Sequence, residues 1–220
     1  MMGHGLRLWN KPAPQKRRAR EALTNDDVNL VLYGQVLMAV FFAVCVALHP
    51  GFVLKRNEGG VSNYGVHLTT CVPYSAAYAI AGTLSWIVGS RIRAARLLDV
   101  TRILRGYAAL LMTTLVTTYF YTLTLLSRDV HIAVGALLFA FEIVTSWWMA
   151  RRLGRWRDWS WLAIQWAGSA LAALTIAGMV QVLFLSQVIS GVGYAVVLVS
   201  YCRSRVSDDG GGGVRLHASA

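Results

Sequence analysis

Long runs of apolar residues, separated by short polar segments, occupy most of the chain between residues 28 and 203. A helix needs about 20 such residues to cross the hydrocarbon core of a bilayer, at about 1.5 Å of rise per residue. The pattern predicts an all-α membrane protein, a bundle of six spans. These are residues 28–48, 71–90, 106–126, 131–150, 160–179 and 183–202. The boundary between the last two is the least marked, because Gly178 to Leu183 contains no charge and no proline.

Charge predicts how the spans are oriented. Six of the 21 lysines and arginines precede the first span, five lie in 90–105, four in 151–157 and three in the C-terminal tail. Only Lys55, Arg56 and Arg128 lie on the other side. Because short basic loops stay cytoplasmic, we expect a protein of the cell membrane with both termini cytoplasmic. The net charge of +11 is divided among four segments, so a nucleic-acid partner is not expected.

Composition and local signals divide the chain into three parts. Only 14% of the residues are charged, against about 25% in soluble domains. We expect a basic cytoplasmic tail at 1–27, the six-span domain at 28–203 and a flexible, Gly-rich tail at 204–220. Thr24 and Asp27 have capping-box spacing and are expected to start the first helix, an uncleaved signal anchor. The segment 90–106, "SRIRAARLLDVTRILRG", predicts a separate amphipathic helix lying in the membrane interface.

Residues 49–70 form the only sizeable loop predicted on the outer side. Its glycines and asparagines suit tight turns, which is what a simple connector requires. The alternative is a lid over the bundle that contacts a polar ligand. Tyr64 is then the expected anchor into the helix tops. The other candidate ligand-binding residues of this loop are Lys55, Arg56, Glu58, Ser62 and His67.

The loop also carries a short Ser-x-x-Gly element, Ser62-Asn63-Tyr64-Gly65. With six spans and both termini inside, this element resembles the bacterial six-span family related to FRAG/DRAM/Sfk-type membrane proteins. The resemblance covers about residues 28–203, and Asn63 stands where the relatives usually have an acidic residue. The eukaryotic relatives handle lipids and lipid anchors, so the resemblance implies a lipid context for this chain.

One ionisable residue lies deep within a predicted span. Glu142 follows His131 by eleven residues, which places it roughly 16 Å below the outer end of the fourth span, near the bilayer midplane. A carboxylate there is costly unless it is protonated, paired or hydrated, and such residues usually mark function. The plainer interpretation is a protonated side chain that bonds a neighbouring helix.

Further polar residues in the third and fourth spans are candidate partners of Glu142. Thr113, Thr117, Tyr121 and Thr124 recur at helical spacing, and Gly135, Phe139, Glu142 and Ser146 share one face. Of these, Thr117, Tyr121, Glu142 and Ser146 are the predicted ligand-binding residues. The threonines can equally bond their own helix carbonyls, without any functional role.

Other chemistry has weaker support. His49, His67 and His131 with Glu58 match no known ligand spacing, so no metal or other cofactor is expected. Cys45 and Cys71 both lie near the outer ends of the first two predicted spans. A disulfide between them is therefore an alternative to two free thiols. No catalytic constellation is recognisable, which leaves enzymatic activity undecided. The Trp- and Arg-rich segment 147–161 fits interface anchors or a site for anionic lipid head groups at the inner face.

These observations favour a multi-pass protein that binds or handles a membrane lipid or other amphiphile in a polar bundle interior, below an outer lid. Two alternatives stay open. A proton-coupled transporter would use Glu142 as its proton site, although no span has an internal proline to break a helix. A non-catalytic scaffold or regulatory protein would use small residues for helix packing. Those residues are Gly168, Ala172, Gly191 and Ala195. The oligomeric state is not predicted.

Overall fold

The computed structural model describes residues 22–53 and 60–211, and these ranges contain helices and turns but no strand. The prediction of an all-α protein is therefore confirmed. The long helices are α2 (Asn25–Leu48), α4 (Cys71–Arg91), α5 (Leu98–Phe120), α6 (Leu125–Leu153), α7 (Trp156–Ile176) and α8 (Leu183–Gly211). Short helices connect them: η1 (Pro50–Val53), η2 (Gly60–Ser62), α3 (Asn63–Val66) and η3 (Ala95–Leu97).

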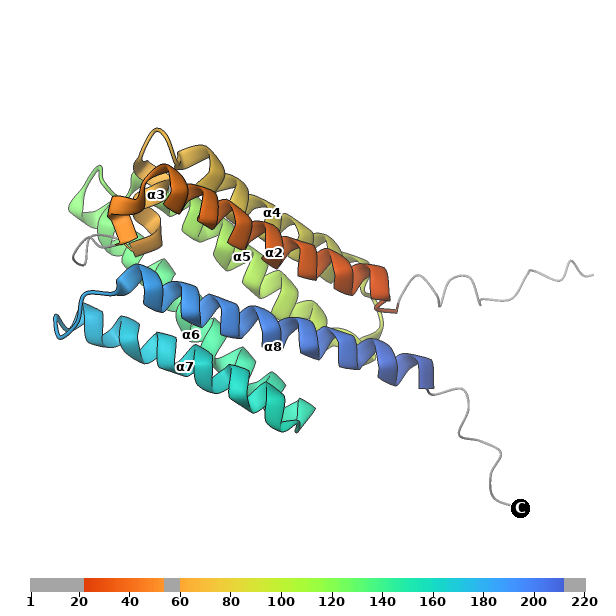
Figure 1. Ribbon diagram of the computed structural model, residues 1–220. Coiled ribbons are helices and arrows are strands. Elements are labelled where there is room, and N and C mark those ends of the chain that lie inside the picture. Colours follow the sequence, from red (N-terminus) through yellow and green to blue (C-terminus); the bar gives the residue numbers. More distant parts are fainter. Residues whose placement is uncertain (1–21, 54–59, 212–220) are drawn as a thin grey trace, which may run out of the picture.

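The long helices run along one common direction and form two groups (Figure 1). Helices α2, α4 and α5 pack in chain order, and α7 pairs closely with α8. Helix α6 joins the groups by packing against α5, α7 and α8, while α8 also contacts α2. The start of α2 and the end of α8 lie at one end of the bundle, here called the terminal end. Helix α3 lies at the other, the α3 end.

Five of the described helices are long and apolar enough to cross a membrane, which supports the assignment to the membrane. They are α2, α4, α5 together with η3, α6 and α8 up to Ser207. Helix α7 is 21 residues long, but it is not among the five. Its Gln165 and its Trp- and Arg-rich first turn lower its apolar character. The structure thus supports a helical protein with several membrane spans.

Local signals define the helix ends largely as expected. The Thr24 side chain accepts a hydrogen bond from the Asp27 amide, and the Asp27 carboxylate accepts one from the Thr24 amide, which confirms the predicted capping box. The turn between α7 and α8 contains Gly178 at φ 78°, within the expected boundary. This backbone region is open to glycine at little cost.

The predicted interfacial helix and the predicted third span were both misplaced. Helix α5 begins at Leu98, so most of the amphipathic segment forms its first turns rather than a separate helix. Val100, Ile103 and Leu104 are buried against the bundle, which gives this stretch an inward face. Helix α5 ends at Phe120, six residues early, because Thr124 caps the start of α6 through the Ser127 amide.

Helix α8 extends beyond the predicted membrane domain. The flexible tail was expected from residue 204, whereas the helix continues to Gly211. Arg205 explains part of this extension, because its guanidinium lies 3.3 Å from the Asp99 carboxylate and donates to the Arg96 carbonyl at 2.9 Å. The Tyr201 hydroxyl also donates to Asp99. These contacts tie the last turns of α8 to the start of α5.

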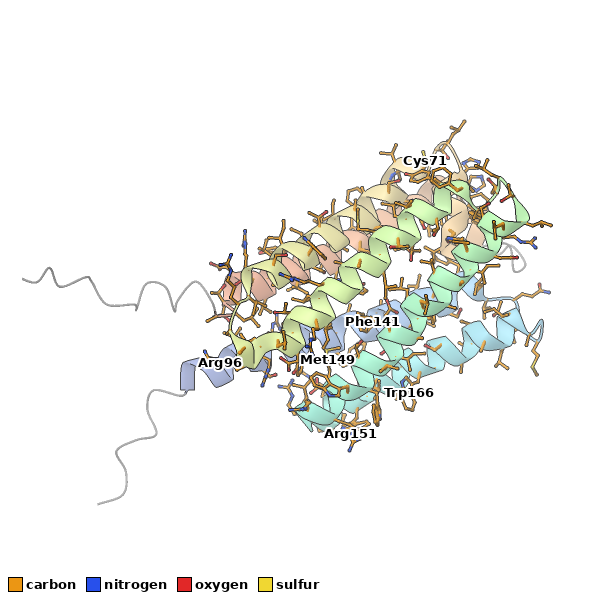
Figure 2. All side chains as sticks on the ribbon, turned by 180° about the vertical axis from the view of Figure 1, so that it is seen from behind. Cys71, Arg96, Phe141, Met149, Arg151 and Trp166 are labelled. Carbon is orange, nitrogen blue, oxygen red and sulfur yellow. The ribbon has the colours of Figure 1, made fainter. Side chains whose placement is uncertain are left out.

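Arginine side chains gather at the terminal end, where Arg96 and Arg151 lie far from Cys71 at the opposite end (Figure 2). The Arg151 guanidinium lies 4.9 Å from the centre of the Trp147 ring. The Arg152 guanidinium lies 5.0 Å from that of Trp148. Such pairs are typical of membrane-interface anchors.

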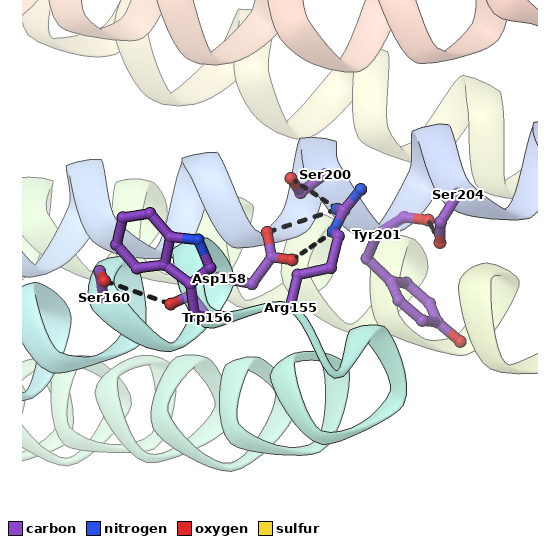
Figure 3. A network of polar contacts seen from close by, with 7 residues as sticks. All are labelled: Arg155, Trp156, Asp158, Ser160, Ser200, Tyr201 and Ser204. Atoms are coloured by element: carbon purple, nitrogen blue, oxygen red, sulfur yellow. Dashed lines mark hydrogen bonds and ion pairs between the residues drawn. The ribbon is translucent and has the colours of Figure 1, made fainter.

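A buried acid at the same end joins α7 to α8 (Figure 3). The Asp158 side chain is fully buried, and Arg155 Nε donates to its Oδ2 at 2.7 Å. The same guanidinium donates to the Ser200 hydroxyl of α8 at 3.3 Å. One arginine therefore neutralises the acid and links the two helices.

A candidate ligand-binding cavity

A cavity of about 1400 Å³ lies between the two groups of helices. Its lining runs on α2 from Gln35 to Val46 and on α8 from Leu183 to Ala195, so it occupies the α3 half of the bundle. Helices α4 to α7 complete the walls, and Val61, Ser62 and Asn63 form a roof. Most lining side chains are apolar. The volume exceeds the roughly 300–1,000 Å³ of typical small-molecule pockets.

Missing side chains help to create this space. Gly135 of α6 and Gly191 of α8 both line the cavity, and a Cβ added at either would meet no atom within 4 Å. Gly191 was predicted as a packing residue of a scaffold, but it faces open space. Gly168 does pack helices, because an added Cβ would lie 2.6 Å from the Ser190 nitrogen of α8.

The cavity reaches the side of the bundle. Ile132 of α6, Ile176 of α7 and Val192 of α8 line it, yet they are 60%, 78% and 44% exposed. These apolar side chains would face lipid in a membrane. An apolar molecule could therefore enter from the bilayer without crossing the roof.

The deep end of the cavity is polar. Glu142 lines it and is 7% exposed, and no described residue makes a hydrogen bond to its carboxyl group. Gln35 lines the same cavity; its Oε1 accepts from the Tyr107 hydroxyl at 3.3 Å, while its buried Nε2 has no partner. Tyr78, Tyr107 and Tyr194 lie within electrostatic range of Glu142.

The roof, in contrast, is held by a chain of hydrogen bonds. His131 of α6 is buried, with Nε2 at 2.8 Å from the Ser62 hydroxyl and Nδ1 at 3.1 Å from the Thr117 hydroxyl. The Tyr121 ring stacks on His131 at 5.0 Å, and its hydroxyl donates to Asn63 Oδ1 at 3.3 Å. These bonds join the loop to α5 and α6.

Helix α8 holds the other side of the roof. Gln187 Oε1 accepts from the Val61 amide at 2.8 Å. This contact depends on Gly60, which adopts φ 54° and whose missing Cβ would collide with the Gln187 side chain. A glycine is therefore required by both backbone and space at this position.

Tyr64 anchors the loop, as predicted. Its side chain is fully buried, with its ring 5.3 Å from that of Phe52 and 5.6 Å from that of Phe184. The Thr70 hydroxyl donates to the Tyr64 carbonyl at 2.7 Å. Burial raises the pKa of the Tyr64 phenol above its usual value. His67 lies beside this cluster, 4.4 Å from the His49 ring.

The structure brings only some of the predicted ligand residues to the cavity. Glu142, Tyr121 and Ser62 line it, and Thr117 reaches it through His131. Ser146 is buried but does not line the cavity, and its hydroxyl donates to the Ile143 carbonyl at 3.1 Å. Tyr64 and His67 support the roof without lining the cavity. Lys55, Arg56 and Glu58 fall outside the described residues.

Two cavity residues were missed as ligand candidates. His131 was considered only for metal binding, although it lies eleven residues before Glu142 and hence on the same helical face. Gln35 is an amide within an apolar run, and this sequence signal is typical of a polar contact inside a bundle. Its approach to Tyr107 and to the cavity depends on tertiary packing between α2 and α5 and could not be read from either segment alone.

Most threonine hydroxyls of α5 donate hydrogen bonds to backbone carbonyls of their own helix. Thr113 donates to the Ala109 carbonyl at 2.8 Å, and Thr114 donates to that of Leu110 at 2.8 Å. Thr118 does the same and also bonds the Tyr74 hydroxyl at 2.9 Å. The local interpretation of the threonine pattern is therefore correct for these residues.

The three cysteines are not bonded to one another. All three are free thiols, so the disulfide considered between Cys45 and Cys71 is absent. Cys45 Sγ instead contacts the Thr70 carbonyl at 3.7 Å, and Cys71 Sγ contacts that of Leu68 at 3.4 Å. Within the described ranges, no three histidine, cysteine or acidic side chains come together as metal ligands would.

Comparisons with family models, curated proteins and solved structures gave no match to this chain. The resemblance to the FRAG/DRAM/Sfk-type family therefore stays a prediction. Any functional conclusion has to come from the cavity, its apolar walls and its polar deep end.

Proposed function

We propose that this chain is a six-span protein that binds a lipid or other amphiphile in the cavity beneath the roof. The sixth span is α7. At about 1.5 Å per residue its 21 residues extend about 31 Å, enough for the hydrocarbon core of a bilayer. It runs antiparallel to α8 over its length (Figure 1). The excess of basic residues at the terminal end favours the cytoplasmic side for both ends.

The cavity itself is the observation that carries the proposal. It is large, mostly apolar and open at the side between exposed isoleucines, which suits an apolar chain or ring system arriving from the bilayer. The carboxyl group of Glu142 and the Nε2 of Gln35 offer polar contacts at its deep end. An amphiphile combines both properties in one molecule.

The roof has a supporting role in this proposal. Ser62 bonds His131 of α6, which in turn bonds Thr117 of α5, and the Val61 amide donates to Gln187 of α8. Tyr64 fixes the base of the roof. A fixed roof closes the α3 end to water, so that the ligand exchanges with the membrane. Residues 60–70 then act as the lid that the sequence suggested.

Photolabelling of cavity-filled variants tests this function. Purified protein in lipid nanodiscs is exposed to a hexadecyl alcohol that carries a diazirine on its chain, and labelled peptides are identified by mass spectrometry. We expect labelling of the cavity-lining segment of α6 between Ile132 and Ile143. Gly135→Leu and Gly191→Leu should reduce it, because both positions line the cavity and a Cβ at either would meet no atom within 4 Å.

Ala170→Leu provides the matched control, since it adds the same side chain to an exposed position of α7 outside the cavity. It should label like the unmodified protein. Equal labelling of all four proteins would contradict binding in the cavity. Proton-coupled transport, the alternative raised by Glu142, additionally requires flux of the bound molecule in proteoliposomes driven by a pH gradient.

A further inference from the structure

We propose that the deep end of the cavity recognises a cationic group, a protonated or quaternary amine carried on an apolar body. This inference rests on the proposed function and names the class of ligand. It comes from the contrast between the two polar ends of the cavity. One end has its polar groups paired within the protein, and the other does not.

The polar side chains of the roof already have hydrogen-bond partners within the protein. His131 bonds both Ser62 and Thr117, and Asn63 accepts from Tyr121. At the deep end, the Glu142 carboxyl, which can only accept hydrogen bonds when ionised, has no hydrogen-bond partner in the described part of the chain. Because unpaired buried polar groups are costly, the deep end is where a ligand gains most by supplying a partner.

Among the described residues that line the cavity, no basic side chain is close to Glu142 along α6. Of the residues that line the cavity, Arg128 and His131 are the basic ones, and they lie 14 and 11 positions before Glu142 on α6. These separations correspond to about 21 Å and roughly 16 Å along the helix. Arg128 is also 3.9 Å from the Asp129 carboxylate. A carboxylate without a nearby cation can be neutralised by a proton or by a charged ligand.

The surroundings of Glu142 suit an ammonium group in a second way. Tyr78 and Phe42 both line the cavity, with ring centres 5.8 Å apart in an edge-to-face arrangement. Of these two rings, that of Tyr78 also lies within electrostatic range of the Glu142 carboxyl. Aromatic faces attract cations, most strongly where water is excluded. A carboxylate next to aromatic rings therefore favours a lipophilic amine over a neutral or anionic molecule.

Three matched probes test the charge preference. Hexadecyl diazirine probes with a trimethylammonium, a hydroxyl or a sulfate head group are compared by competition labelling in nanodiscs made of zwitterionic lipid. We expect the trimethylammonium probe to bind about tenfold or more tightly than the hydroxyl probe. Glu142→Gln, which keeps the size of the side chain, should reduce this ratio to near one.

Asp129→Asn is the matched control, because it removes an exposed carboxylate near the roof on the same helix. It should retain the preference of the unmodified protein. Equal binding of all three probes, or a preference for the sulfate, would overturn the inference while amphiphile binding still stood. Failure of every probe to label the cavity would contradict the proposed function as well. Should Glu142→Gln not fold, the probe preference of the unmodified protein decides the question.

Discussion

At the scale of single residues, Glu142 is the acidic side chain among the described residues that line the cavity. Glu142 was recognisable because a charge within an apolar span is costly wherever the span packs. Its lack of a hydrogen-bond partner among the described residues, however, depends on which side chains the other helices bring near it. The pairing of His131 with Ser62 joins residues 69 positions apart and was equally invisible from local pattern.

The anchoring of the roof by Tyr64 makes a prediction about one side chain. Tyr64→Ala should destabilise the roof by about 3–5 kcal/mol, because a fully buried ring is removed from between Phe52 and Phe184. Tyr64→Phe keeps the ring and loses only a long 3.4 Å bond to the His49 carbonyl, so its effect should stay below about 1.5 kcal/mol. Hydrogen exchange of the amides in 60–70 measures both. Exchange at random-coil rates in the unmodified protein would contradict an anchored lid.

The buried Asp158 gives a second prediction at this scale. Arg155→Ala leaves the fully buried carboxylate without its partner and should lower the free energy of unfolding by about 1–3 kcal/mol. Arg157→Ala removes an exposed arginine from the same turn and should cost less than about 0.5 kcal/mol. Unfolding in mixed micelles, followed by tryptophan fluorescence, compares the two. Equal losses would show that pairing with Asp158 adds nothing to the effect of removing one arginine from this turn.

At the scale of the elements, the sequence predicts where helices occur better than it predicts their first and last residues. The apolar runs located the helices, because burial in lipid demands length and hydrophobicity together. The polar face of residues 90–106 favours a separate interfacial helix, so the sequence does not predict that α5 begins at Leu98. Burial of Val100, Ile103 and Leu104 against neighbouring helices decided otherwise. Likewise, the last turns of α8 depend on Asp99, which lies far away in the sequence.

The pairing of α7 with α8 gives a prediction about packing. Gly168→Ala should destabilise the protein by about 1–3 kcal/mol, because the new methyl group would lie 2.6 Å from the Ser190 nitrogen and 2.8 Å from the Ser186 oxygen of α8. Gly191→Ala is the matched control on α8. It meets nothing within 4 Å and should be neutral or stabilise by up to about 1 kcal/mol through helix propensity. The unfolding midpoint in mixed micelles checks both. A stable Gly168→Ala protein would mean that the two helices are not in close contact there.

At the scale of the whole molecule, the number of membrane crossings decides where the ends of the bundle lie. Five helices meet the criteria of length and hydropathy on their own, and an odd number would place the start of α2 and the end of α8 on opposite sides. If α7 also crosses, as we propose, the number of crossings is even. Helix α7 packs closely along α8, so the two would cross together. The distribution of arginines supports the even count, because the connections at the terminal end carry most of them.

Cysteine accessibility in a background without Cys45, Cys71 and Cys202 tests this topology. Leu68→Cys lies at the α3 end, where Leu68 is 91% exposed, and should react with a membrane-impermeant maleimide in intact cells. Met179→Cys, in the turn after α7, starts from a residue that is 73% exposed and should react as well. Arg157→Cys at the start of α7 and Ser207→Cys near the end of α8 should react only after permeabilisation. If α7 does not cross the membrane, positions 157 and 179 will react from the same side. Ser207→Cys would then react from the same side as Leu68→Cys if only the other five helices cross.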